Sequence, residues 1–247
     1  MKQALRTRRP LKPDYGIDKP KALARLFLAG MAALASGYLL PSYDVAATAP
    51  LLGPTFLALG CLSLGACVLM LAWSLKGKFV VRDRMLNLVR WRGDETVLDL
   101  GTGRGLLAIG AASRLKTGMV VGIDAWESER ASATIEEAQR NIDLAGVADR
   151  VELRNDDPRD IGFVDKSFDV VLSLSFLHTL DKEAARPATC REIARVLRAR
   201  GLVAIADVGR GAEWAKALEA AGLKVEKPQR LPPLAFTALE LVVARKT

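Results

Sequence analysis

Two long stretches without charged residues dominate the first third of this 247-residue chain. The first runs from Leu26 to Tyr43, and the second runs from Val45 to Leu75, with Asp44 between them. As a helix rising about 1.5 Å per residue, the first would be about 27 Å long, close to the roughly 30 Å core of a bilayer, and the second would exceed it. We predict a hairpin of two membrane-spanning helices, over about residues 26–43 and 51–75.

Two other interpretations of these stretches stay open. Helices buried in a soluble bundle would also be apolar, but they normally keep a polar face, and neither stretch has one. A cleaved secretory signal is the second alternative, because Ala47-Thr-Ala49 resembles a cleavage site after an apolar segment. The long basic leader and Pro50 directly after that site count against it.

Ala29, Ala33 and Gly37 repeat every four residues, a small-residue face on which a second membrane helix could pack.

Positive charge is concentrated at the two outer flanks of the predicted hairpin. Residues 1–25 carry a net charge of +6, residues 76–84 carry +3, and residues 85–247 are neutral in sum. Cytoplasmic flanks of membrane helices are rich in Lys and Arg, so we expect the basic N-terminal segment, 1–25, and a domain over 76–247 to be cytoplasmic. The basic residues would then lie near anionic lipid head groups. The neutral domain argues against nucleic-acid binding, in spite of the chain's net charge of +8.

From Arg82 onward, short apolar runs alternate with segments typical of amphipathic helices. This alternation predicts a parallel sheet with helices on both faces, and its final strand is expected near residues 235–244. Ligands of such sheets bind beyond the carboxyl ends of the strands. Residues that follow directly after the strands are therefore the first candidates for a functional site.

The first of these runs ends in an acidic, glycine-rich sequence, Asp99-x-Gly101-x-Gly103-x-Gly105. Glycines suit a sharp turn in which bare backbone amides approach a ligand closely. A second apolar run follows and ends in Asp124. The spacing from Gly101 to Asp124 is the one at which a carboxylate can accept the hydroxyls of a ribose.

This sequence resembles motif I of the class I S-adenosylmethionine-dependent methyltransferases. A dinucleotide-binding turn would instead read Gly-x-Gly-x-x-Gly, and residue 106 is Leu. Over about residues 80–247 the likeness is closest to the ubiquinone/menaquinone-type small-molecule methyltransferases. It implies an α/β fold with a doubly wound, mostly parallel seven-stranded sheet, the Rossmann-like methyltransferase fold, whose last strand inserts antiparallel. The further segments that agree in order and spacing are 151–157, 163–173, 176–180 and 191–201.

The resemblance also implies that S-adenosyl-L-methionine is the cofactor. Asp124 would bind its ribose, and Asp157 aligns with the acid that contacts the adenine amine. Asp156 replaces a glycine of the family, and Pro158 lacks the backbone N–H that relatives offer to adenine. The residues expected to bind the cofactor are Asp99, Gly101, Thr102, Gly103, Gly105, Asp124, Trp126, Asp156, Asp157 and Ser173.

Three of the candidate residues keep structural alternatives. Asp99 would orient the amino group of the cofactor or brace the glycine turn, and Trp126 would lie against adenine or pack in the core. His178, the only histidine, lies where the family often places one near the substrate, although packing is the alternative to a catalytic role. With one histidine and three cysteines, we expect neither a metal site nor a disulfide framework.

We therefore expect a membrane-anchored methyltransferase that acts on a lipid or another hydrophobic small molecule at the cytoplasmic membrane face. The segment from Arg84 to Thr247 leaves no room for the lid that many relatives place over the acceptor. The N-terminal segment, the hairpin or the bilayer surface would then help to close the site. A methyltransferase of a soluble RNA or protein, and a non-catalytic cofactor-binding membrane module, are the alternatives. The acceptor atom and oligomerisation through the apolar helices stay open.

Overall fold

The computed structural model divides into two compact units. The residues that it describes are 12–40, 49–127, 133–180, 185–231 and 239–247. Within those ranges, the first unit holds residues up to 15, 82–230 and 240–247, and the second holds 16–81 and 231–239.

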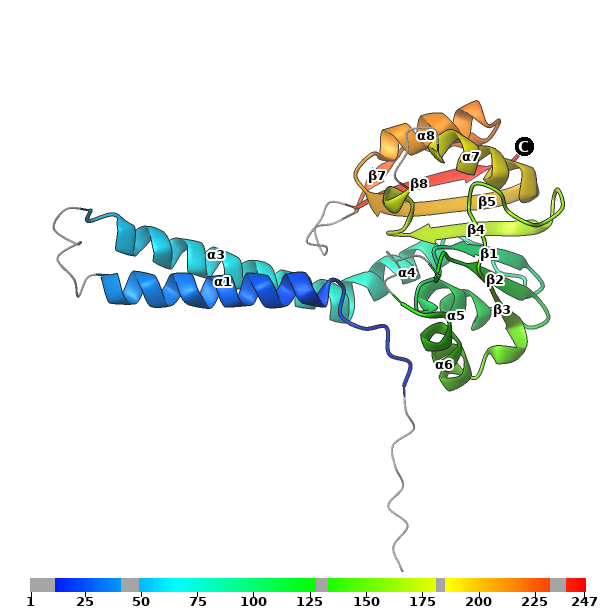
Figure 1. Cartoon of the computed structure of the whole chain (residues 1–247). Coiled ribbons are helices and arrows are strands. Elements are labelled where there is room, and N and C mark those ends of the chain that lie inside the picture. The colour runs from blue at the N-terminus through cyan, green and yellow to red at the C-terminus, as the bar shows by residue number, and fades with distance from the viewer. Residues whose placement is uncertain (1–11, 41–48, 128–132, 181–184, 232–238) are drawn as a thin grey trace, which may run out of the picture. The chain divides into compact units, whose positions relative to one another are not determined.

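A mixed β-sheet forms the centre of the first unit (Figure 1). Its strands among the described residues are β1 (Thr96–Leu100), β2 (Met119–Ile123), β3 (Val151–Arg154), β4 (Phe168–Leu174), β5 (Leu197–Val208), β6 (Lys224–Val225), β7 (Gln229–Arg230) and β8 (Leu239–Arg245). They are arranged in the order β3-β2-β1-β4-β5-β8-β6, and β7 also pairs with β8. The pairs among β1 to β5 are parallel, whereas β6 and β7 run antiparallel to β8.

The sheet confirms the predicted α/β class, with one difference in strand number. The structure has eight strands in its described residues rather than seven, because the segment before the last strand forms two short strands of two residues each. The last strand, β8, inserts between β5 and β6 and runs antiparallel to β6, and the resemblance implied an antiparallel insertion of this strand. Buried apolar residues such as Val97, Leu98 and Val171 fill the central strands, as expected where helices cover both faces.

Helices flank the two halves of the sheet. In Figure 1, α5 (Leu106–Ala112) and α6 (Ile135–Ala145) lie beside β1 to β3, and α7 (Ala185–Val196) and α8 (Gly211–Ala220) lie beside β5 and β8. The helix α4 (Lys78–Leu86) precedes the sheet, and short 3₁₀ turns η3 (Ala148–Arg150) and η4 (Leu177–Thr179) precede β3 and follow β4. A capping box between Thr134 and Glu137 starts α6, and Gly146 in a left-handed conformation ends it.

Two long apolar helices, α1 (Pro20–Leu39) and α3 (Leu52–Ala72), lie side by side in the second unit (Figure 1). Glycines let their backbones approach closely, because a Cβ atom at Gly60 would lie 2.6 Å from Leu34 Cγ and 2.9 Å from the Gly30 carbonyl oxygen. The Ser63 hydroxyl also donates to the Leu26 carbonyl across the pair at 2.7 Å. Of the predicted small-residue face, Gly37 is buried against α3, but Ala29 is exposed and Gly30 takes its place.

The helix boundaries differ from those predicted. The first helix begins at Pro20, a residue suited to a first helical turn, so it includes Lys21 and Arg25. After α3 the chain passes through a π-helical turn, η2 (Trp73–Gly77), directly into α4. The predicted connector residues 41–48 lie outside the described residues.

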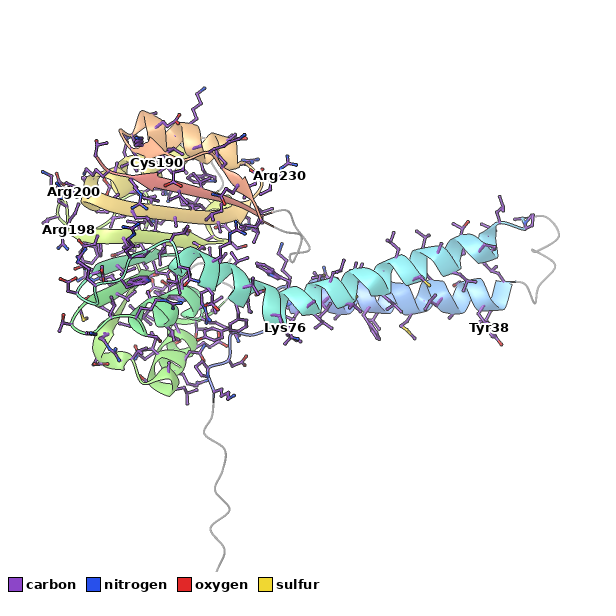
Figure 2. All side chains as sticks on the ribbon, turned by 180° about the vertical axis from the view of Figure 1, so that it is seen from behind. Tyr38, Lys76, Cys190, Arg198, Arg200 and Arg230 are labelled. Atoms are coloured by element: carbon purple, nitrogen blue, oxygen red, sulfur yellow. The ribbon has the colours of Figure 1, made fainter. Side chains whose placement is uncertain are left out.

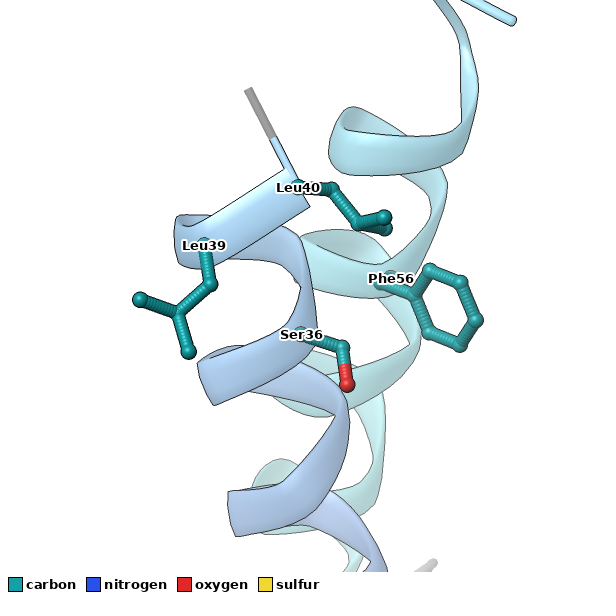
Figure 3. A pocket seen from close by; sticks show the side chains of 4 residues that line it. All are labelled: Ser36, Leu39, Leu40 and Phe56. Carbon is teal, nitrogen blue, oxygen red and sulfur yellow. The ribbon is translucent and has the colours of Figure 1, made fainter. Parts of the chain in front are cut away.

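Both helices are long and apolar enough to cross a membrane by length and composition, a property that signal sequences and core helices of soluble proteins share. Only 11% of the most apolar part of each helix is buried, so most of the two helices is not covered by the described chain. Exposed Tyr38 and Lys76 lie near opposite ends of the pair (Figure 2). A shallow groove lined by Ser36, Leu39, Leu40 and Phe56 lies between the two helices at the Tyr38 end (Figure 3).

Candidate functional site

The glycine-rich turn after β1 has the conformation that its sequence predicts. Gly101, Gly103 and Gly105 have φ angles of +78°, +53° and +87°, in the left-handed region that side chains disfavour. The amides of Gly101 and Thr102 donate to the Ile123 carbonyl at 2.9 and 3.2 Å, which ties the turn to the end of β2. Gly105 then begins α5 as its N-cap.

Two of these glycines are required for different reasons. A Cβ atom at Gly101 would lie 1.9 Å from Phe176 Cγ, so the Phe176 side chain packs directly on the turn. A Cβ atom at Gly103 would meet no atom of the described chain within 4 Å. Gly101 is therefore needed for packing within the protein, whereas Gly103 presents bare backbone to open space.

Asp99 braces the glycine turn with one carboxylate oxygen and leaves the other oxygen unpaired among the described residues. Its Oδ2 accepts the Ala108 amide of α5 at 3.0 Å, and the Thr102 hydroxyl donates to its carbonyl at 3.0 Å. Its Oδ1 is buried without a hydrogen-bond partner among the described residues. Burial raises the pKa of Asp99 to about 7. One oxygen thus braces the turn and the other remains an acceptor.

Asp124 and Trp126, which follow β2, both bind the backbone of Gly103. Asp124 Oδ2 accepts the Gly103 amide at 2.7 Å, and its Oδ1 accepts the amide of Ala125 at 2.7 Å. Partial burial raises the pKa of Asp124. The Trp126 indole donates to the Gly103 carbonyl at 3.1 Å, and its ring is buried.

The two acids after β3 have unlike surroundings. Both carboxylate oxygens of Asp157 accept from the Arg159 guanidinium, and this pairing lowers the pKa of Asp157. Asp156 Oδ2 is buried and has no partner among the described residues. Pro158, which follows, is buried and has no N–H to donate. Asp156, not Asp157, is therefore the acid with an acceptor to spare.

Ser173 and His178 lie at the end of β4 and just beyond it. The buried Ser173 hydroxyl donates to the Leu100 carbonyl at 2.9 Å, so it braces β4 against β1. His178 Nδ1 lies 2.6 Å from Asp207 Oδ1, and the His178 amide donates to Asp207 Oδ2 at 2.7 Å. A carboxylate can only accept, so in the neutral ring Nδ1 carries the proton and Nε2 is an acceptor.

Asp207 was missed from the sequence. It lies near the end of β5, is 2% exposed, and pairs with a His178 side chain that is 33% exposed. The signal that could have found it was present, because β5 also ends in an acid, as do the runs that end at Asp99 and Asp124. A buried carboxylate that orients a partly exposed imidazole is an arrangement suited to proton transfer.

The predicted residues thus gather at the carboxyl ends of neighbouring strands. The cluster around the turn after β1 has an unpaired buried oxygen of Asp99, an open backbone at Gly103 and a carboxylate at Asp124. These groups would suit the ammonium group, the bulk and the ribose of a nucleoside that carries an amino acid, such as S-adenosylmethionine. Among the described residues there is no group of three or more His, Cys, Asp or Glu that could hold a metal ion.

Residues 97–201 match the protein family described as "Methyltransferase domain". A 27-O-demethylrifamycin SV methyltransferase of Amycolatopsis mediterranei is 34% identical over 125 residues, which are 51% of this chain and 43% of that protein. A nocamycin O-methyltransferase of Saccharothrix syringae is 35% identical over 126 residues, 51% of this chain and 42% of that protein. The chain therefore spans less than half the length of these curated relatives.

Solved structures share the fold at low identity. A SAM-dependent methyltransferase from Aquifex aeolicus superposes with a TM-score of 0.56 and 20% identity, covering 67% of this chain and 89% of that one. A geranyl diphosphate methyltransferase in complex with GPP and sinefungin gives a TM-score of 0.57 and 16% identity, covering 68% and 78%. Residues 97–201 therefore match a methyltransferase domain, and the fold of the chain is shared with S-adenosylmethionine-dependent methyltransferases of known structure.

Proposed function

We propose that this protein is a membrane-anchored methyltransferase that methylates a lipid or another hydrophobic small molecule at the cytoplasmic membrane face. One observation carries the proposal: the chain joins a methyltransferase domain to two long apolar helices, and only 11% of the most apolar part of each helix is buried. Exposed apolar area of this extent is rare on soluble proteins, and a bilayer is the partner that would cover it.

The charge of the flanks supports the cytoplasmic orientation. The basic segments 1–25 and 76–84 stand at the two outer flanks of the hairpin in the sequence, and such segments stay on the cytoplasmic side of membranes. They would also attract anionic lipids, at about 1 kcal/mol for each charge near the surface.

The names of the relatives favour a small acceptor. They include methyltransferases of demethylrifamycin and nocamycin type, and one fold neighbour is named for geranyl diphosphate, an isoprenoid. The sequence resemblance to ubiquinone/menaquinone-type enzymes adds a prenylated quinone ring to the acceptors that we would test first. The neutral charge of residues 85–247 disfavours RNA.

S-adenosyl-L-methionine, the cofactor that we infer, would supply a methyl group on a positively charged sulfur, and the residues around the glycine turn would hold it. Asp99 Oδ1 would accept from its amino group, and the backbone of Gly103 would leave room for its bulk. Asp124 would accept from the ribose hydroxyls, because a carboxylate has about four acceptor positions and the described residues donate to two of them. Thr102, Trp126 and Ser173 support these groups through their hydrogen bonds to the backbone.

His178 is the residue placed to remove a proton from the acceptor. Asp207 keeps the proton on Nδ1, so that Nε2 is the basic atom. Asp207 is a positioning residue, since it acts through the imidazole. Correct placement of the acceptor supplies the rest of the rate enhancement, because alignment of the reactants alone lowers the activation free energy by several kcal/mol.

Labelling of a lipid extract tests the function as a whole. The detergent-purified protein is incubated with S-adenosylmethionine that carries a labelled methyl group, together with total lipid, RNA and protein fractions. We expect label in the organic phase and not in the macromolecular fractions. Label in RNA or protein would contradict the proposed acceptor class, and label nowhere would favour the cofactor-binding module.

The membrane topology gives an independent prediction. A reporter fused after residue 45 should lie outside the cytoplasm, and one fused at the C-terminus should lie inside, because the positive flanks remain with the cytoplasm. The measurement uses a pair of reporters active on opposite sides of the membrane. If both reporters lie on the same side of the membrane, or if the protein is recovered in the soluble fraction without detergent, the membrane hairpin is refuted.

The raised pKa of Asp99 predicts a pH effect on folding and on binding. Between its ordinary pKa near 4 and its folded pKa of about 7, the folded state holds one more proton than the unfolded state, so stability falls as pH rises through this window. The ionised form is the one that binds an ammonium group, so cofactor affinity should rise about fivefold from pH 6 to pH 7. Calorimetry should show both effects in the native protein and neither in Asp99→Asn.

Removal of each acid after β3 separates the two candidates for the adenine amine. Asp156→Ala should weaken cofactor binding by about tenfold or more, because the free carboxylate oxygen is lost. Asp157→Ala should have a smaller effect, since it chiefly releases Arg159. Titration calorimetry compares the two variants, and a larger loss at Asp157 would reverse the assignment.

A further inference from the structure

The segment before the first apolar helix is bound to the methyltransferase domain by one buried side chain. Asn141 of α6, which is 3% exposed, accepts the Asp14 amide at its Oδ1 at 2.8 Å. Its Nδ2 donates to the Asp14 carbonyl at 2.8 Å and to the Arg104 carbonyl at 3.0 Å. The side-chain amide thus pairs with both backbone groups of a residue that lies 127 positions away.

Arg104 connects the same contact to the glycine-rich turn after β1. It stands between Gly103 and Gly105, so its carbonyl belongs to that turn. Its guanidinium lies 2.8 Å from Glu137 of α6 and 3.9 Å from the Asp14 carboxylate. Both the backbone and the side chain of Arg104 are therefore tied to α6, and Asn141 holds the turn and the N-terminal segment together.

The next residue of the segment is also seated on the domain. Tyr15 is partly buried, and this burial raises the pKa of its phenol, with the opposing influence of the nearby Arg82 charge. Residues 12–15 group with the methyltransferase unit, whereas the chain from residue 16 onward groups with the helix pair. The segment is thus a part of the domain that the sequence places before the hairpin.

We propose that residues 12–15 form a strap and that Asn141 is a positioning residue, which uses this strap to hold the Gly103–Gly105 turn in its ligand-binding shape. The proposal rests on the proposed role of the turn in cofactor binding. A turn that is already ordered binds its ligand more tightly, because less conformational freedom is lost on binding. Loss of the strap should therefore weaken cofactor binding, even though neither Asn141 nor Asp14 is assigned a contact with the cofactor.

The coupling must act in both directions. If the strap favours cofactor binding, then the cofactor must favour the docked strap by the same factor. A purely structural role of Asn141 in α6 would give no such link. Hydrogen exchange of the Asp14 amide measures the docked strap directly, because Asn141 Oδ1 protects that amide.

The experiment uses the full chain in detergent, with cofactor affinity measured by calorimetry and the thermal midpoint measured alongside. Asn141→Ala should lower the affinity for S-adenosylmethionine about tenfold, the size of effect expected for loss of one or two hydrogen bonds. Gln139→Ala is the matched control, because its exposed amide donates to the exposed Asp143 of the same helix. Gln139→Ala should bind the cofactor as the native protein does.

Exchange at Asp14 completes the test. In the native protein, saturating cofactor should slow exchange of this amide by about the factor that Asn141→Ala loses in affinity, and in Asn141→Ala it should have no effect. Where Asn141→Ala does not fold, Asp14→Pro removes the same amide donor and leaves all of α6 unchanged. If the folded variants bind the cofactor with native affinity, or if the exchange rate of the Asp14 amide does not change when cofactor is added, the strap proposal is wrong and the proposed function is unaffected. A native protein that binds no cofactor would refute the proposed function, and the strap's role with it.

Discussion

Replacement of Gly103 by valine should weaken S-adenosylmethionine binding by more than about a hundredfold, or ~2.7 kcal/mol, while the protein still folds. The backbone of Gly103 faces open space, and no atom of the described chain lies within 4 Å of the position that a Cβ atom would take. A valine side chain would therefore fill space that the ligand needs, and its Cβ atom would displace no neighbour among the described residues. Calorimetry of the purified variant measures the loss.

The matched control is Gly146→Val at the end of α6. Gly146 has a φ angle of +67° against +53° for Gly103, and its Cβ direction is equally open. A branched side chain strains both backbones to a similar extent, so a fall in the thermal midpoint should be common to the two variants. Only Gly103→Val should lose the cofactor. Equal affinities in the two folded variants would remove Gly103 from the site.

The glycine turn after β1 could be predicted from the sequence because its determinants are local. The spacing of Gly101, Gly103 and Gly105 predicted a sharp turn, and the structure forms one with left-handed backbone at all three glycines. The acids Asp99 and Asp124 could be placed because parallel strands end at one edge of a sheet, so order along the chain fixes position in space.

The features that were missed depend on contacts between distant segments or on competition between neighbours. Asp207 and His178 are 29 residues apart, and Asn141 and Asp14 are 127 apart, so no local pattern reports either pair. The assignment of the acid after β3 depends on Arg159, whose guanidinium occupies the carboxylate that the family resemblance favoured. A linear motif does not show which of two adjacent acids already has a partner.

The helix pair shows the same division. Two uncharged stretches predicted two apolar helices, and the structure contains both. The packing face was assigned one residue away from where it lies at Gly30, because several small residues share the helix and four-residue spacing alone cannot choose among them. The choice depends on Leu34 and Ser63, which contact the partner helix.

His178→Ala should reduce turnover on the acceptor identified by lipid labelling about a hundredfold to ten-thousandfold, with little change in cofactor affinity. The imidazole is bonded to Asp207 rather than to the glycine turn proposed to hold the cofactor, so we expect its loss to affect proton removal and not binding. Asp207→Asn is the more specific test, because His178 itself is kept and only its partner is changed. An amide removes the charged acceptor of the Nδ1 proton, and where its nitrogen faces Nδ1 it turns the ring proton toward Nε2; either change weakens the base.

The two variants together separate general-base catalysis from simple packing. If His178 only packs, Asp207→Asn should alter the thermal midpoint and leave kcat intact. If His178 is the base, Asp207→Asn should lower kcat strongly, and His178→Gln, which keeps a polar side chain without a basic nitrogen, should not restore it. Full turnover by His178→Gln would show that the acceptor needs no base from this chain, and that alignment with the activated methyl group suffices.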